Sequence, residues 1–86
     1  MTETRKTILI TGAAGFIGRR LAALLSERYA VRCLVRDALR AKPLLPHAVE
    51  VVPGDMTDVA TLRAAVEGCA AVVHLAALKI DEPDIV

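Results

Sequence analysis

Three glycines, Gly12, Gly15 and Gly18, stand three residues apart in the segment T-G-A-A-G-F-I-G at positions 11–18. A glycine at position 12 lets the backbone turn sharply where a side chain would clash. A glycine at position 15 lets the main chain approach a bound pyrophosphate, and one at position 18 lets a helix pack tightly on a strand. The spacing predicts an anion-binding loop, although Ala14 replaces the second glycine of the common G-x-G-x-x-G pattern.

Such a loop must connect a strand to a helix if it is to bind an anion in this way. Before it, the apolar run T-I-L-I at positions 7–10 predicts a short strand buried on both faces. After it, apolar residues recur with a helical period from Phe16 onward. We expect this apolar stripe to face the core: Ile17, Leu21, Leu24 and Leu25. The first N–H groups of the helix, at Phe16 and Ile17, would then face the anion.

Further along the chain, short apolar runs alternate with helical segments. Strands are expected at about residues 6–11, 31–35, 49–52 and 71–75. A short helix fits residues 37–42, and Thr57 or Asp58 can cap another that ends near Gly68. The apolar stripe of that last helix consists of Val59, Leu62, Val66 and Cys69.

This alternation predicts an α/β fold, in which helices flank both faces of a parallel sheet. Right-handed crossovers would place the strands in the order 3-2-1-4. A chain of 86 residues has room for one domain at most. We expect residues 76–86 to form a tail that follows the fourth strand.

The loop pattern T-G-x-x-G-x-x-G, with its strand and helix, resembles that of the extended short-chain dehydrogenase/reductase family, which includes NAD-dependent epimerases and dehydratases. The segment G-D-M-T-D at positions 54–58 resembles the family's G-D-[LM]-x-D segment, and V-V-H-L-A-A-L-K at positions 72–79 resembles its fourth-strand signature. The resemblance covers roughly residues 6–79. It implies that residues 1–86 form a partial, truncated NAD(P)-binding domain of the Rossmann type.

The resemblance also implies roles for individual residues. Asp55 would contact the adenine, or else it caps the following helix. The backbone of Leu75, Ala76 and Ala77 would line the ribose and nicotinamide side, and Lys79 would lie near the cofactor or be a solvated loop lysine. The complete set expected at the cofactor is Gly12, Gly15, Phe16, Ile17, Gly18, Arg36, Asp37, Asp55, Met56, Leu75, Ala76, Ala77 and Lys79.

The choice between NADP and NAD depends on Arg36 and Asp37, which end the second strand. A carboxylate at the end of the strand accepts hydrogen bonds from the ribose hydroxyls and repels a 2′-phosphate, so it favours NAD. A guanidinium there binds that phosphate with charge-assisted hydrogen bonds. Arg36 occupies the position expected at the end of the strand, and Asp37 comes one residue later. We therefore expect NADP or NAD, with NADP slightly favoured.

Members of the family catalyse hydride transfer with a Tyr-x-x-x-Lys pair. The one tyrosine of this chain is Tyr29, and Cys33 stands where the lysine would be. We therefore expect a dinucleotide-binding fragment without independent catalysis. Two alternatives stay open: half of a split or self-associated enzyme that another chain completes, and a non-catalytic regulator that senses NADP.

Composition excludes several other partners. The 11 basic and 10 acidic residues leave a net charge of +1, which offers no surplus for binding nucleic acid. No run approaches the roughly 20 apolar residues that span a membrane. Cys33 and Cys69, with His47 and His74, lack the spacing of a metal site, so we expect no metal.

The cysteines fit a reduced, cytoplasmic protein, and His74 fits a hydrogen-bonded core histidine rather than a catalyst.

The fourth strand, residues 71–75, would lie at the edge of the sheet if no further strand follows it. Such an edge presents unpaired N–H and C=O groups that can pair with another chain. The sequence therefore predicts self-association through this exposed edge.

Overall fold

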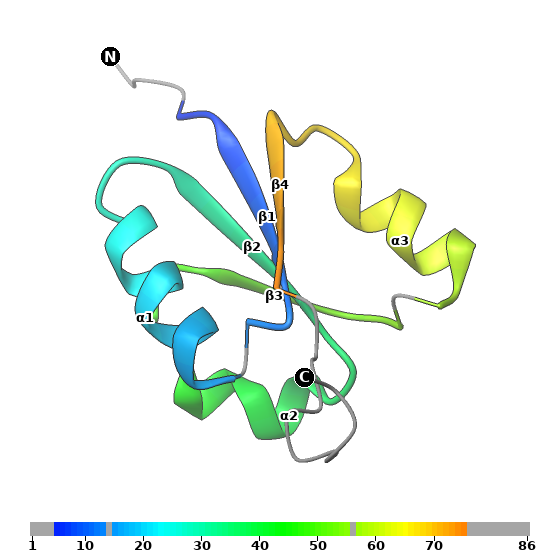
Figure 1. Ribbon diagram of the computed structural model, residues 1–86, viewed down its shortest axis with the longest axis horizontal. Coiled ribbons are helices and arrows are strands. Elements are labelled where there is room, and N and C mark those ends of the chain that lie inside the picture. Colours follow the sequence, from blue (N-terminus) through cyan, green and yellow to red (C-terminus); the bar gives the residue numbers. More distant parts are fainter. Residues whose placement is uncertain (1–4, 14, 56, 76–86) are drawn as a thin grey trace, which may run out of the picture.

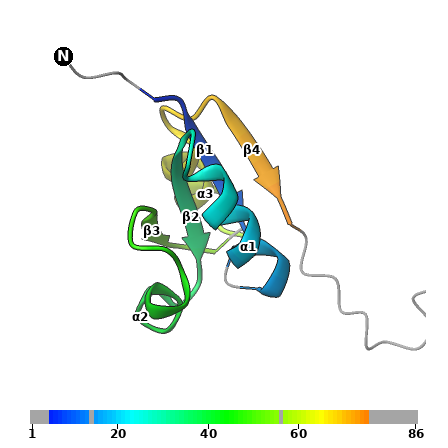
Figure 2. The same cartoon turned by 90° about the vertical axis from the view of Figure 1, so that its left-hand side faces the viewer.

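A four-stranded parallel sheet forms the centre of the computed structural model, which describes residues 5–13, 15–55 and 57–75 (Figure 1). Its strands are β1 (Thr7–Thr11), β2 (Ala30–Val35), β3 (Glu50–Pro53) and β4 (Ala71–His74). They lie in the order β3-β2-β1-β4, with β3 and β4 at the two edges (Figure 2). The predicted α/β class and strand order are confirmed.

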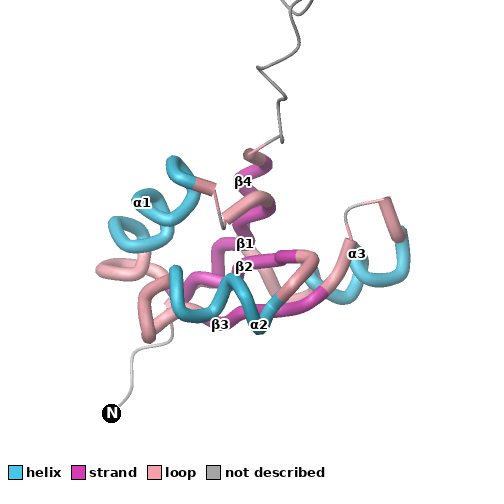
Figure 3. The backbone as a smooth tube through the Cα atoms, turned by 90° about the horizontal axis from the view of Figure 1, so that it is seen from below, coloured by secondary structure: helices cyan, strands magenta, loops and turns pink. Residues whose placement is uncertain are grey.

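Helices cover the two faces of the sheet. They are α1 (Phe16–Leu25), α2 (Ala38–Ala41), the short 3-10 helix η1 (Lys42–Leu44) and α3 (Val59–Val66). Viewed along the sheet, α1 and α3 lie on opposite sides of the strands (Figure 3). The connections run from strand to helix to the next strand, as right-handed parallel units require.

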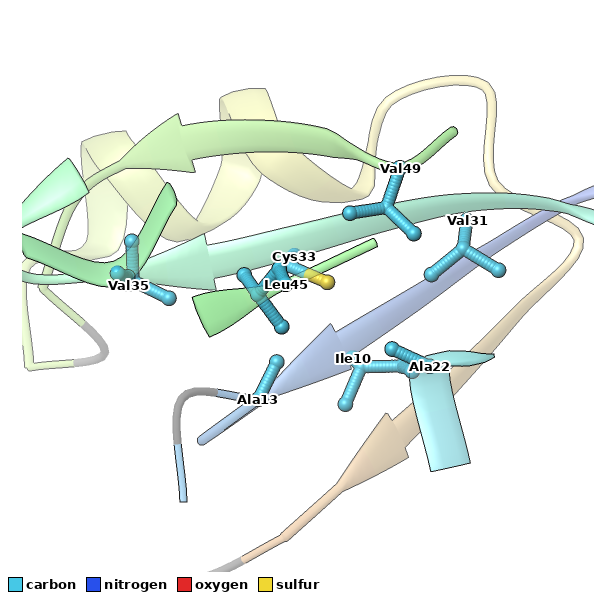
Figure 4. Close-up of a cluster of buried hydrophobic side chains, with 9 residues drawn as sticks. Ile10, Ala13, Ala22, Val31, Cys33, Val35, Leu45 and Val49 are labelled. Carbon is cyan, nitrogen blue, oxygen red and sulfur yellow. The ribbon is translucent and has the colours of Figure 1, made fainter. Parts of the chain in front are cut away.

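The larger hydrophobic core lies between the sheet and the helices α1 and α2. Ile10 of β1 is fully buried there, and it pairs in register with Cys33 of β2 and Val73 of β4. Figure 4 shows the buried side chains that converge on this face from both strands and helices. They are Ile10, Ala13, Ala22, Val31, Cys33, Val35, Ala41, Leu45 and Val49.

The smaller core lies on the other face, where Leu9 and Leu34 pack against Ala65 of α3. The side chains of β1 alternate between the two cores, because successive residues of a strand point to opposite faces. This alternation explains why every residue from Ile8 to Thr11 is buried. The predicted burial of the first strand on both faces is confirmed.

The predicted apolar stripes of both long helices are partly wrong. On α1, Ile17 and Leu24 are 69% and 66% exposed, whereas Gly18 and Ala22 are buried. The smallest residues allow the closest approach to the rest of the fold, so the contact face of α1 is centred on them and the larger residues lie at its margin. The same holds for α3, where Ala65 is buried and Val59 is 65% exposed.

The two ends of α3 are held by polar contacts. At its start the Asp58 carboxylate accepts a hydrogen bond from the N–H of Ala60 at 3.0 Å, so Asp58 is the predicted N-cap. At its end Arg32 of β2 donates to the carbonyl oxygens of Ala65 and Glu67 at 2.7 and 2.8 Å. A cation placed on these carbonyls also matches the negative end of the helix dipole.

Candidate functional site

The carboxyl ends of the four parallel strands lie at the same end of the sheet. Each strand is followed by a segment that the sequence analysis singled out. The register places Thr11 of β1 beside both Leu34 and His74. The N–H of Leu75 donates to the Thr11 carbonyl at 3.1 Å, which brings the end of β4 against the glycine loop. Ligands of open α/β sheets bind at this carboxyl end of the strands.

The glycine loop is built as its spacing predicts. Gly12 has a φ of +76°, and a Cβ there would overlap the carbonyl oxygen of Leu75. At Gly18 a Cβ would come within 2.6 Å of the Ala13 Cα and 2.7 Å of the Gly12 oxygen. Gly18 therefore lets α1 pack closely on the loop itself, rather than on the strand as predicted.

Gly15 is the N-cap of α1, and it leaves the first turn of the helix open. Having no side chain, it gives the N–H groups of Phe16 and Ile17 no side-chain cap, and the first turn holds no acidic residue. A Cβ on Gly15 would meet only the Gly12 oxygen, at 3.6 Å, so the loop's outer side is free of crowding. An uncapped helix start without nearby negative charge fits a pyrophosphate.

Arg36 and Asp37, after β2, have different surroundings. The Asp37 carboxylate is the N-cap of α2 and accepts a hydrogen bond from the N–H of Arg40 at 3.2 Å. Arg36 is exposed, and its guanidinium makes no hydrogen bond or ion pair within the described residues. The Arg36 side chain, directly after β2, is therefore available to a ligand, whereas one carboxylate oxygen of Asp37 is engaged at the start of α2.

Asp55, after β3, is held by a neighbour rather than acting as a helix cap. Its Oδ1 accepts hydrogen bonds from the backbone N–H and the hydroxyl of Thr57, both at 2.9 Å. These two bonds, and then the positive charge of Arg36, hold the pKa of the Asp55 carboxyl below its usual value. Since Asp58 caps α3, the alternative role expected for Asp55 is wrong.

The end of β4 is described as far as Leu75, a half-buried residue beside Gly12. Met56, Ala76, Ala77 and Lys79 lie outside the described residues.

His74 is exposed rather than buried, which corrects the prediction of a core histidine. Its Nδ1 nevertheless lies 2.7 Å from the hydroxyl of the fully buried Thr11. The predicted hydrogen-bond partner is thus present at the boundary of the core.

Tyr29 lies at the amino end of the strands, whereas the glycine loop lies at their carboxyl end. It directly precedes β2, whose amino end is at Ala30, and its N–H donates to the Leu25 carbonyl of α1. Cys33 is fully buried, and burial raises the pKa of its thiol to about 11. These two residues cannot take the place of a Tyr-x-x-x-Lys pair beside the predicted cofactor.

Thr57 was expected only as a possible helix cap, and Thr61 was not singled out from the sequence. Thr61 accepts from the N–H of Asp55 at 3.2 Å and donates to its carbonyl at 2.8 Å. A threonine two residues after an aspartate is a known turn signal, so Thr57 was detectable in principle. The contact of Thr61 depends on how α3 begins.

The described residues also set limits on other sites. They bring together no group of three or more His, Cys, Asp or Glu side chains that could hold a metal ion. No helix in the described ranges has both the length and the apolar character needed to cross a bilayer.

Comparison with known proteins identifies the family. The NAD(P)H-binding family model matches residues 12–84, which is most of the chain. The chain belongs to this NAD(P)H-binding family. Its homologues are epimerases and reductases of the short-chain dehydrogenase/reductase type, so the resemblance seen in the motifs is confirmed.

Two curated relatives illustrate the match. The 3 beta-hydroxysteroid dehydrogenase/Delta 5-->4-isomerase of Mycobacterium tuberculosis is 41% identical over 80 residues, which covers 91% of this chain and 21% of the relative. The Epimerase family protein SDR39U1 homolog, chloroplastic, of Arabidopsis thaliana is 38% identical over 80 residues, or 91% of this chain and 22% of the relative. The chain thus spans about a fifth of the length of each.

Solved structures show the same Rossmann-like fold. Pen from Bacillus thuringiensis superposes with a TM-score of 0.74 at 25% identity, over 92% of this chain and 26% of that one. The NADPH-dependent quinone oxidoreductase from Escherichia coli gives a TM-score of 0.71 at 26% identity, over 80% of this chain and 26% of that one.

Proposed function

We propose that this chain binds a nicotinamide dinucleotide at the carboxyl ends of its strands and prefers NADP to NAD. We also propose that it does not catalyse hydride transfer alone. The contrast between Arg36 and Asp37 carries the preference. Asp37 caps α2 with its carboxylate, while Arg36 is exposed and has no partner in the described part of the chain. A free guanidinium at this position suits a 2′-phosphate.

The other expected contacts follow the order of the strands. The N–H groups of Phe16 and Ile17 would bind the pyrophosphate beside Gly15, and Asp55 would accept from the adenine. The backbone around Leu75 would line the nicotinamide side, with Ala76, Ala77, Met56 and Lys79 as further candidates. When bound, the nicotinamide ring supplies hydride transfer.

The chain's place in a larger system is a separate part of the proposal. The described residues form a four-stranded sheet, and Tyr29 lies away from the proposed site. We therefore favour a dinucleotide-binding fragment. A reducing, cytoplasmic compartment suits it, because Cys33 and Cys69 are both free.

One observation favours the alternative of an enzyme completed by another chain or by a second copy. β4 pairs only with β1, so its outer edge carries no strand among the described residues. Unpaired backbone groups on such an edge can accept a strand from another chain. The remaining alternative, a regulator that senses NADP, would use the same binding site.

Calorimetric titration with NADPH and NADH in parallel tests the proposal. We expect tighter binding of NADPH, and an Arg36→Ala variant should lose at least about 10-fold in NADPH affinity with little change for NADH. Asp37→Asn is the matched control, because asparagine caps helices as well as aspartate and only the charge is removed.

The outcomes separate the parts of the proposal. Binding of neither dinucleotide overturns the function itself. Equal losses for both cofactors in Arg36→Ala overturn the role of Arg36 at the phosphate. If Asp37→Asn weakens NADH binding, Asp37 rather than Arg36 recognises the ribose.

A further inference from the structure

The Asp55 carboxylate is held on one side only. Both donors of Thr57, its backbone N–H and its hydroxyl, bind the same oxygen, Oδ1, at 2.9 Å. Oδ2 has no hydrogen-bond partner among the described residues. Asp55 is partly exposed and follows β3 at the end of the sheet where the glycine loop also lies.

The backbone of Asp55 is fixed as firmly as its side chain. The hydroxyl of Thr61 accepts from the Asp55 N–H at 3.2 Å, and its single proton is shared between the carbonyl oxygens of Asp55 and Asp58, at 2.8 and 3.0 Å. Thr61 lies in the first turns of α3, and it also limits the space at Gly54, where a Cβ would come 3.0 Å from the Thr61 Cβ. Asp55 is therefore tied to the start of α3.

We propose that Thr57 is a positioning residue for adenine recognition: it occupies Oδ1 of Asp55 and so presents Oδ2 as the acceptor for the exocyclic amino group of adenine. This inference rests on the proposed function. Thr57 stands at the x position of the G-D-[LM]-x-D segment.

The chemistry predicts a specific discrimination. An ionised carboxylate only accepts hydrogen bonds, so it pairs with an amino group and is repelled by a carbonyl oxygen. Hypoxanthine carries an oxygen where adenine carries its amino group. A dinucleotide with hypoxanthine should therefore bind more weakly than one with adenine, and the difference should depend on how well Thr57 holds Asp55.

The test compares NADP with nicotinamide hypoxanthine dinucleotide phosphate in calorimetric titrations. Thr57→Val removes the hydroxyl but keeps the β-branched shape and the backbone N–H. We expect this variant to lose about 3- to 10-fold in affinity for NADP, the size of one hydrogen bond, with little change for the hypoxanthine analogue. Thr57→Ser, which restores the hydroxyl, should restore the discrimination.

A second measurement needs no ligand. Carbon-detected NMR titration of the Asp55 carboxyl should show that its pKa rises in Thr57→Val and returns in Thr57→Ser, because the hydroxyl donates to the ionised form. The charged groups nearest to this carboxyl, Arg36 after β2 and Asp58 at the start of α3, are unchanged in both variants. Thermal unfolding monitors whether each variant remains folded.

The results distinguish this inference from the function on which it rests. If the wild-type chain binds neither dinucleotide, the proposed function fails, and the inference fails with it. If NADP binds but Thr57→Val weakens both dinucleotides equally, or neither, the positioning role is overturned. An unchanged Asp55 pKa in Thr57→Val would overturn the hydrogen-bond geometry.

Discussion

Gly12 and Gly68 share a left-handed backbone but have very different surroundings. Their φ angles are +76° and +80°, a region that costs a residue with a side chain about 1–2 kcal/mol. At Gly68 an added Cβ would meet nothing within 4 Å, whereas at Gly12 it would overlap the Leu75 carbonyl oxygen. The backbone angle alone therefore does not measure how strongly a position requires glycine.

This difference gives a matched pair of substitutions. Gly68→Ala should lower the free energy of unfolding by about 1–2 kcal/mol, from backbone strain alone. Gly12→Ala adds an overlap with the backbone of β4, so it should lose a further 1–3 kcal/mol or so. Urea denaturation of the two variants checks the prediction, and equal losses would show that the loop can move away from β4.

Among the elements, α3 depends on a side chain from a distant strand. Arg32 of β2 binds the carbonyl oxygens at the C-terminal end of α3 and also lies 2.9 Å from the Glu50 carboxylate of β3. The Glu50 side chain is 60% exposed, so the ion pair is largely in water. The contact with the Ala65 carbonyl is partly buried, and we expect the helix contacts to contribute more to stability than the ion pair.

Two variants separate these contributions. Arg32→Met keeps the apolar stem and removes the guanidinium, so it should cost about 1–3 kcal/mol because the carbonyls of α3 lose their donor. Glu50→Gln should cost less than about 1 kcal/mol. Hydrogen exchange of the α3 amides, measured beside the unfolding free energy, should show faster exchange in Arg32→Met only. Equal effects in both variants would assign the stabilisation to the ion pair instead.

For the molecule as a whole, β4 is the exposed element. Among the residues that the structure describes it pairs only with β1, Val72 is 48% exposed, and both Ala71 and His74 are exposed. An apolar strand edge is a template for pairing with another chain, so self-association through β4 stays a prediction.

Val72→Lys tests it, because a lysine on an edge strand opposes pairing with a second strand. We expect the wild-type chain to form larger species as its concentration rises in light scattering, and Val72→Lys to shift these toward the monomer. Leu39→Lys is the control, since Leu39 lies on α2 and is 87% exposed. A wild-type chain that is monomeric at high concentration would contradict the prediction.

Much of the fold follows from patterns within short segments. The order of strands and helices and the turn at Gly12 depend on neighbours within a few residues and were predicted, and the cap at Asp58 was one of two predicted positions. The glycine loop is likewise a local feature, because the spacing of its glycines predicts both the turn and the close approach of α1. Local backbone preferences are written in consecutive residue types, so the sequence suffices to find them.

The features that were wrong or missed depend on residues far apart in the chain. Which face of α1 is buried depends on how closely Gly18 approaches the glycine loop and Ala22 approaches the core, and the periodic spacing of apolar residues does not predict these distances. Arg32 meets the carbonyls of α3 across 33 and 35 residues of sequence, and Thr11 meets His74 across 63. Such contacts arise only when the packed sheet and helices bring the partners together. The amino-acid sequence alone therefore indicates the loop for a dinucleotide. The tertiary structure decides which side chains remain free to bind it.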